Sequence, residues 1–142
     1  MAHARIDLAD PASFRHWVDE VLRFGDQDAG GHINNVSVAR YVESGRVLFM
    51  RHAGMPPFGA DERVVIARVA IDYLKESHWP AAARVGTAVI RIGTKSFTLG
   101  SGVFVAGDCI ATAESVAVFM RNGQSAALPE AGRAWLEVQN PA

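Results

Sequence analysis

The sequence lacks several features that mark common classes of protein. Its 142 residues include one cysteine, Cys109, which excludes an internal disulfide and a cysteine-based zinc motif. Basic and acidic residues nearly balance, the formal net charge is -1, and no dense basic run occurs. This balance gives no electrostatic reason to expect a nucleic-acid partner. An anionic ligand would therefore have to be bound by a few well-placed cations.

Long apolar runs are also missing. No stretch approaches the roughly 20 apolar residues that a membrane-spanning helix needs. The first residues show no apolar segment typical of a secretory signal. We therefore expect a cytoplasmic protein without a membrane segment. The length and the 49% hydrophobic content are ordinary for a globular protein, and we expect one domain over residues 1–142.

Familiar catalytic and nucleotide-binding signatures are absent as well. There is no G-x-S-x-G elbow, since Gly100-Ser101-Gly102 has the wrong spacing. No P-loop or G-x-G-x-x-G is present, and the five histidines show no H-x-x-x-H spacing. We therefore predict neither a metal site nor an organic cofactor. Cys109 lies in a strand-like run, which favours a buried, unreactive thiol.

The arrangement of polar and apolar residues predicts one helix and several strands. Residues 17–24 alternate as a strand does, and residues 35–53 place apolar side chains at helical spacing before Gly54. Asn34 or Asn35 is a suitable N-cap. Gly45 lowers helix propensity, so we expect it to pack closely against a sheet.

The rest of the chain reads as strands joined by short turns. We predict strands at residues 65–73, 84–92, 96–105 and 109–121, followed by a short helix between Leu128 and Val138. An α+β fold results, in which about five antiparallel strands carry the long helix across one face. The opposite face and the sheet edges need cover, so we expect an obligate oligomer.

Residues 26–35, DQDAGGHINN, form the densest polar cluster, just before the predicted helix. A helix N-terminus has free N–H donors and partial positive charge, which can polarise a carbonyl. Asp28 could act beside it as a general base or as a nucleophile. An aspartate in an ordinary turn is the alternative reading. A calcium loop is excluded because Gly30 and Ser37 stand at two ligand positions.

This run resembles the signature of hot-dog-fold thioesterases of the 4-hydroxybenzoyl-CoA thioesterase-like group. The helix that follows carries Tyr41, Glu43 and Arg46 at the offsets found in that group. Weaker similarities lie in Thr94-Lys95-Ser96-Phe97 and in Leu128-Pro129-Glu130. The order of strand, helix and four strands agrees over roughly residues 15–136.

The resemblance implies a curved antiparallel sheet wrapped around one long helix, and hydrolysis of an acyl-CoA thioester at a subunit interface. It implies Asp28 as the catalytic residue, no metal or cofactor, and homodimers that can pair into homotetramers. The substrate-binding residues that we predict with it are Gly31, His32, Asn34, Asn35, Lys95 and Ser96.

Three further expectations accompany the resemblance. Glu43 and Arg46 are one helical turn apart and are expected to form a structural pair. Lys95, with Arg91 or Arg121, could contact CoA phosphates or belong to an ordinary solvated surface. Val38 stands where an aromatic residue is frequent in the family. If this position borders the acyl pocket, the acyl preference should differ from that of members with aromatic substrates.

Two other functions are compatible with the same fold. One is hydration of an enoyl thioester, although the spacing of Asp28 and His32 does not resemble that of hot-dog hydratases. The other is a non-catalytic module that binds acyl-CoA.

Overall fold

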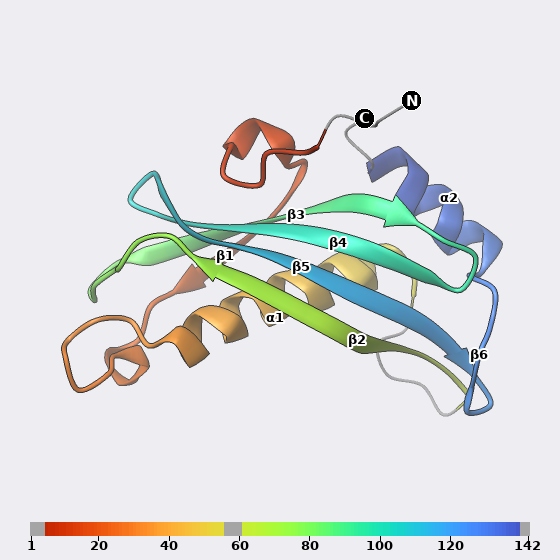
Figure 1. Cartoon of the computed structure of the whole chain (residues 1–142), viewed down its shortest axis with the longest axis horizontal. Coiled ribbons are helices and arrows are strands. Elements are labelled where there is room, and N and C mark those ends of the chain that lie inside the picture. The colour runs from red at the N-terminus through yellow and green to blue at the C-terminus, as the bar shows by residue number, and fades with distance from the viewer. Residues whose placement is uncertain (1–4, 56–60, 140–142) are drawn as a thin grey trace.

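The computed structural model describes residues 5–55 and 61–139 (Figure 1). Its longest helix is α1 (Asn35–His52), and a second helix, α2 (Glu130–Gln139), lies near the end of the chain. The strands are β1 (His16–Val21), β2 (Glu62–Tyr73), β3 (Ala82–Ile92), β4 (Ser96–Val105), β5 (Asp108–Arg121) and the short β6 (Gln124–Ser125). Two 3-10 turns, η1 (Pro11–Ser13) and η2 (Phe24–Asp26), flank β1.

The sheet has the order β1-β3-β4-β5-β2, with β6 paired to β5, and all these pairs are antiparallel. Figure 1 shows the sheet curving over α1, which crosses one of its faces. This arrangement confirms the predicted α+β hot-dog fold. No helix in the described ranges is long and apolar enough to cross a membrane.

Strand β1 is shorter than predicted, and its end positions the polar run. We predicted a strand over residues 17–24, but β1 ends at Val21 and the η2 turn follows. The backbone N–H of Arg23 donates to Asp26 Oδ2 at 3.0 Å, which closes the turn and ends the strand. Leu22 still donates to the carbonyl of Ala81 at 3.1 Å, so the turn stays anchored to the start of β3.

One face of α1 is buried against the sheet. Its buried residues recur at helical spacing: Ser37, Val38, Tyr41, Val42, Gly45, Arg46, Phe49 and Met50. A Cβ at Gly45 would lie 2.6 Å from Val85 Cγ1, a distance that real Cβ atoms essentially never show. The expected close packing at Gly45 is therefore confirmed.

Arg46 has a different partner from the one that we predicted. The residue is 6% exposed, and its Nη1 donates to Ser115 Oγ of β5 at 3.2 Å. Glu43 is exposed, and the two residues form no ion pair among the described side chains, so the predicted Glu43–Arg46 pair is wrong. Arg46 lies on the face of α1 that packs against the sheet, whereas Glu43 lies on the face exposed to solvent.

The outer face of the sheet is partly covered by the N-terminal segment. Phe14 lies over Gly86, where an added Cβ would come within 2.4 Å of its ring, and Leu8 lies over Gly100 in the same way at 2.5 Å. Cys109 packs against the cluster formed by Phe14, Ala88 and Phe104. It is half-buried, whereas we predicted a buried thiol. Burial raises the pKa of its thiol, which agrees with an unreactive side chain.

Candidate active site

Asp26 anchors the polar run to the helix. The residue is 9% exposed, its Oδ2 accepts the hydroxyl of Tyr41 at 2.6 Å, and its carbonyl accepts the N–H of Asn34 at 2.8 Å. Burial raises the pKa of Asp26, but the hydrogen bonds from Tyr41 and Arg23 and the charge of Arg40 outweigh burial and lower it overall. Asp26 is therefore an ionised structural residue, and the Tyr41 offset in the motif reflects this bond.

Asp28 lies in an exposed turn and is held by backbone donors. Its Oδ1 accepts the N–H of Gly30 at 2.9 Å and the N–H of His32 at 3.1 Å. Gly31 adopts a φ of 81°, which favours glycine, and its N–H donates to the Asp28 carbonyl at 3.2 Å. The second oxygen, Oδ2, accepts no hydrogen bond from the described residues, so it is available to a substrate or a water molecule.

The start of α1 leaves the backbone N–H of Asn35 free beside this turn. Asn34 is the N-cap, and its side chain accepts the N–H of Val36 at 2.8 Å. The N–H of Asn34 itself is occupied by Asp26. Among residues 34–36, only the Asn35 amide has no acceptor in the described chain. Since the N-terminus of α1 also carries partial positive charge, Asn35 N–H is suited to hold a developing oxyanion.

Asp28 and Asn35 line one cavity of about 240 Å³. Its wall combines the polar run and first turn of α1 with the segment after β2: Asp28, His32, Ile33, Asn35, Val38, Tyr73, Leu74, Lys75, Glu76, Ser77 and Ile110. Two hydrogen bonds tie the walls together, from Ile33 N–H to the Ser77 carbonyl at 2.8 Å and from the Tyr73 hydroxyl to the Asn35 carbonyl at 3.1 Å.

Sequence reasoning missed the residues that Tyr73 and the following segment contribute to the cavity. They lie about forty positions after the motif and carry no local signature of their own. The alternation of β2 was visible, but its register against β5 was not, and that register brings the end of β2 beside the helix start. Only a correct pairing of β2 with β5 would have indicated that these residues lie at the cavity.

His32 is fixed to this second segment by its side chain. Its Nε2 lies 3.0 Å from Glu76 Oε2, and its ring packs against that of His78 with centroids 5.0 Å apart. His78 Nδ1 in turn lies 3.3 Å from the carbonyl oxygen of Gly31. The predicted substrate residues Gly31, His32, Asn34 and Asn35 thus gather around Asp28, although Gly31 and Asn34 contribute backbone and capping contacts rather than cavity wall.

Lys95 and Ser96 lie elsewhere in the same chain. Tyr73, at the cavity, pairs with Ala111 of β5, whereas Ser96 pairs with Val118, seven positions further along that strand. At about 3.3 Å per residue this separation is roughly 23 Å. One chain therefore does not bring Lys95 and Ser96 to Asp28.

The two arginines grouped with Lys95 are also distant from the cavity. Arg121 is at the far end of β5 and pairs with Glu62 at 3.0 Å. Arg91, near the end of β3, is exposed.

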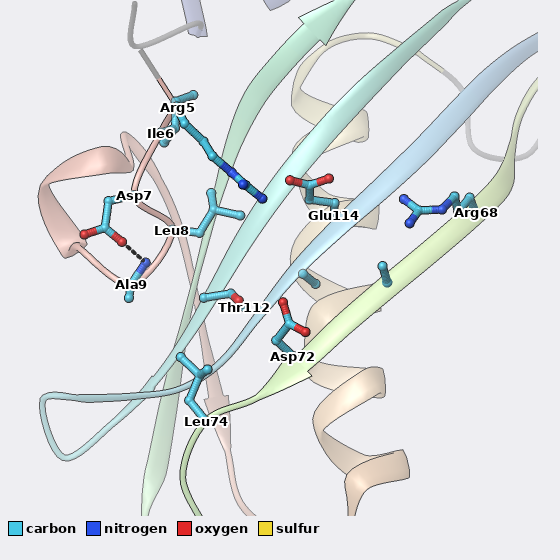
Figure 2. A pocket seen from close by; sticks show the side chains of 12 residues that line it. Arg5, Ile6, Asp7, Leu8, Ala9, Arg68, Asp72, Leu74, Thr112 and Glu114 are labelled. Atoms are coloured by element: carbon cyan, nitrogen blue, oxygen red, sulfur yellow. Dashed lines mark hydrogen bonds between the residues drawn. The ribbon is translucent and has the colours of Figure 1, made fainter.

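A larger cleft of about 640 Å³ lies on the outer face of the sheet (Figure 2). Figure 2 shows Arg5 reaching from the N-terminal segment toward Glu114, with Arg68 and Asp72 of β2 further along the floor. The lining charges have both signs, and the cleft contains neither Asp28 nor a helix N-terminus. The smaller cavity is therefore the candidate active site despite its size.

Within residues 5–55 and 61–139, no group of three or more histidine, cysteine, aspartate or glutamate side chains could hold a metal ion. Independence from metals and cofactors remains a prediction.

The sequence and the fold were compared with known proteins. Residues 22–136 match the model of the thioesterase-like superfamily. Among proteins with curated functions, none matches the sequence significantly.

Similar solved structures support the family assignment. A thioesterase superfamily protein from Jannaschia sp. CCS1 is 29% identical with a TM-score of 0.83, covering 91% of this chain and 85% of its own. A thioesterase from Thermus thermophilus, solved with coenzyme A and Zn, is 26% identical with a TM-score of 0.79, covering 92% of this chain and 97% of its own. The PA5185 protein of Pseudomonas aeruginosa PAO1, with 22% identity, a TM-score of 0.83, and coverage of 91% and 94%, shares the fold. Because the family model matches residues 22–136, which include α1, strands β2 to β6 and the Asp28 cavity, the chain belongs to the thioesterase-like superfamily.

Proposed function

We propose that the protein is an acyl-CoA thioesterase in which Asp28 and the Asn35 N–H act on the thioester carbonyl. One observation carries the proposal: an exposed carboxylate with an unoccupied oxygen and a free amide at a helix N-terminus line the same cavity. Membership in the thioesterase-like superfamily supports hydrolysis of a thioester. The relative from Thermus thermophilus that was solved with coenzyme A supports CoA as the carrier.

The chemistry follows from these two groups. Asp28 accepts a proton from a water molecule as the water oxygen bonds to the thioester carbon. The carbonyl oxygen becomes an oxyanion, which Asn35 N–H stabilises. The C–S bond then breaks, and the CoA thiolate takes the proton from Asp28. In the alternative route, the Asp28 carboxylate attacks the carbon directly, and water hydrolyses the resulting anhydride.

The acyl group is proposed to occupy the apolar end of the cavity. Val38 is buried and lines this cavity with Ile33 and Ile110. A valine occupies less space than the aromatic residue that is frequent at this position in the family. Acyl groups other than the aromatic ones are therefore the first to test, in a panel of short, long, branched and aromatic acyl-CoAs.

We propose a homodimer as the active unit. Strand β2 is an edge of the sheet, and Val69 and Tyr73 on it are 44% and 47% exposed. An apolar sheet edge is a ready surface for pairing with a second copy. Since Lys95 and Ser96 are far from Asp28 within one chain, their predicted substrate contacts require that second copy. Pairing of dimers into tetramers, a cytoplasmic location and independence from metals are proposed with the same function.

The substitution Asp28→Asn tests the proposal. It keeps the size of the side chain and the oxygen that accepts the two backbone N–H groups, but it removes the base. We expect kcat for CoA release, followed with a thiol-reactive dye, to fall about 100- to 10,000-fold, the usual contribution of general base catalysis. Asp19→Asn is a matched control, because Asp19 lies on the exposed outer side of β1 and pairs with Arg84.

Several outcomes would contradict the proposal. Unchanged turnover in Asp28→Asn would refute the mechanism. Binding of acyl-CoA without CoA release across the whole panel would indicate a non-catalytic module. Loss of the double bond from an enoyl-CoA would indicate a hydratase. A product without label after a single turnover in ¹⁸O-labelled water would indicate direct attack, because water that attacks the Asp28 carbon of the anhydride leaves an unlabelled Asp28 oxygen in the product and labels the enzyme.

A further inference from the structure

We propose that Glu76 is a positioning residue that orients the His32 ring, so that His32 Nδ1 and Asp28 together hold the attacking water. The inference rests on the proposed thioester hydrolysis and adds two side chains to it. From the sequence, His32 was expected either to contact the substrate or to orient the turn, and Glu76 was not expected at all.

The backbone places Glu76 beside His32. Ile33, the residue after His32, donates its N–H to the carbonyl of Ser77, the residue after Glu76, at 2.8 Å. The two segments therefore run side by side at the cavity, and both His32 and Glu76 line it. The Nε2–Oε2 distance of 3.0 Å is that of a hydrogen bond.

This contact determines which ring nitrogen faces the reaction. A carboxylate only accepts hydrogen bonds, so a neutral His32 must carry its proton on Nε2. Nδ1 is then an acceptor. A Cβ placed at Gly30 would lie 3.5 Å from His32 Nδ1 and 3.3 Å from Asp28 Oδ1. The missing side chain of Gly30 thus leaves open the space that the carboxylate and Nδ1 share.

A water molecule beside that space can donate to His32 Nδ1 and to Asp28 Oδ2, the carboxylate oxygen that accepts no hydrogen bond from the described residues. As it attacks the thioester carbon, one proton moves to Asp28 and later to the CoA thiolate. The second proton remains on the new acid group, which donates to His32 Nδ1. His32 takes this proton as the product acid ionises and releases it to solvent. The step requires neutral His32 and no co-reactant beyond water.

Exposure determines what Glu76 can contribute. The side chains of His32 and Glu76 are 36% and 72% exposed, so their contact adds little to folding. Its effect is on orientation and on local charge. The other charged or titratable groups facing His32 are the His78 ring, Asp28 and the cavity residue Lys75, whose charge is paired with Asp108.

Two substitutions at Glu76 separate orientation from charge. Gln keeps an oxygen that accepts Nε2–H, whereas Ala does not. We expect Glu76→Ala to lower kcat about three- to tenfold, the rate equivalent of one ordinary hydrogen bond, with KM nearly unchanged. Glu76→Gln should restore the plateau rate.

The ring of His32 gives a readout that does not depend on activity. In ¹⁵N NMR spectra, with the His32 signals assigned by their loss in His32→Asn, the wild type should show the Nε2–H form. Glu76→Ala should show a mixture of both forms. Asp108→Asn is the matched control, because it removes a negative charge that pairs with the neighbouring Lys75, and it should leave His32 unchanged.

Gly30→Ala tests the shared space. The added methyl group should displace the water and lower kcat, and Gly25→Ala should not, since a Cβ at Gly25 meets nothing within 4 Å. An unchanged His32 form and an unchanged kcat in Glu76→Ala would overturn the inference. If Asp28→Asn were inactive in that case, the thioesterase proposal would still stand. Absence of hydrolysis by the wild type would overturn both.

Discussion

Asp26 and Asp28 are two residues apart and have the same side chain, yet their surroundings assign them different roles. Asp26 is enclosed by donors from Arg23, Arg40 and Tyr41, and all its interactions stabilise the turn. Asp28 uses one oxygen for the turn and keeps the other free. The charge of Asp28 is therefore available for chemistry, whereas that of Asp26 is used in folding.

A second pair of residues gives the protein a predicted pH dependence of stability. His16 Nε2 lies 2.7 Å from His52 Nδ1, and the His16 ring packs edge-on against Phe49. Burial, followed by the neighbouring His52, lowers the pKa of His16 from its ordinary value of 6.5. Below pH 6.5 the unfolded chain therefore binds a proton that the folded chain resists, and the stability falls as the pH falls.

We expect the free energy of unfolding, measured by urea denaturation, to be lower at about pH 5.5 than at about pH 7.5. In His16→Gln the decrease should be smaller, since the half-buried titrating group is gone. Asp26 does not contribute in this window, because its pKa is lowered from 3.8 and its stabilisation is lost only at more acidic pH. An equal decrease in both proteins would show that other groups cause the effect.

At the level of elements, the position of α1 on the sheet decides where the backbone N–H of Asn35 lies. Gly45 lets the helix approach β3 closely. The helix begins after its N-cap, Asn34, next to Asp28. The Asn35 N–H can reach the cavity only with this placement. The geometry of the candidate active site thus depends on how one helix packs on one strand.

We predict that Gly45→Ala destabilises the protein despite the better helix propensity of alanine. The new Cβ would meet Val85 Cγ1 at 2.6 Å and Thr87 Oγ1 at 3.4 Å, so overpacking should cost about 1–3 kcal/mol. Ser44→Ala is the control, because Ser44 lies on the same helix and is only half-buried. Thermal unfolding followed by circular dichroism measures both, and a Gly45→Ala protein as stable as the wild type would contradict the close packing.

At the level of the whole molecule, the curved sheet leaves its β2 edge unpaired within one chain. Val36 at the start of α1 is 65% exposed, and Leu74 just after β2 is 53% exposed. Both lie near the Asp28 cavity, since Leu74 lines it and Val36 follows Asn35. A second copy that paired at this edge would therefore cover the exposed apolar surface and also add residues to the Asp28 cavity.

We predict that Val69→Lys shifts the protein toward monomers. A lysine at this exposed position of β2 introduces a charge that pairing of two copies would bury. Light scattering coupled to size exclusion measures the mass, and the acyl-CoA assay should show activity falling with it. A wild-type protein that is monomeric and active at micromolar concentration would refute the dimer proposal. Asp19→Lys, on the β1 side of the sheet, should keep the wild-type mass.

The sequence by itself determined the order of the main elements and indicated residues 26–35 as the candidate site. Alternation and helical spacing reflect which side chains are buried, so the order of strand, helix and four strands followed from local patterns. The local pattern made Asp28 one candidate in an acidic, glycine-rich turn before a helix start, and the resemblance to thioesterases singled it out. The end of β1 was misplaced, since the capping contact from Arg23 to Asp26 is not visible in an alternating pattern.

Only the tertiary structure decided which groups meet. The register of β2 on β5 brings Tyr73 and Glu76 to the cavity from about forty residues away, and it leaves Lys95 and Ser96 at the other end of the sheet. It also sends Arg46 to Ser115 instead of Glu43. Contacts of this kind depend on how the strands pair and where the helix packs on the sheet, and both arise from packing over the whole core. A local pattern of residues records burial but not the partner across the sheet.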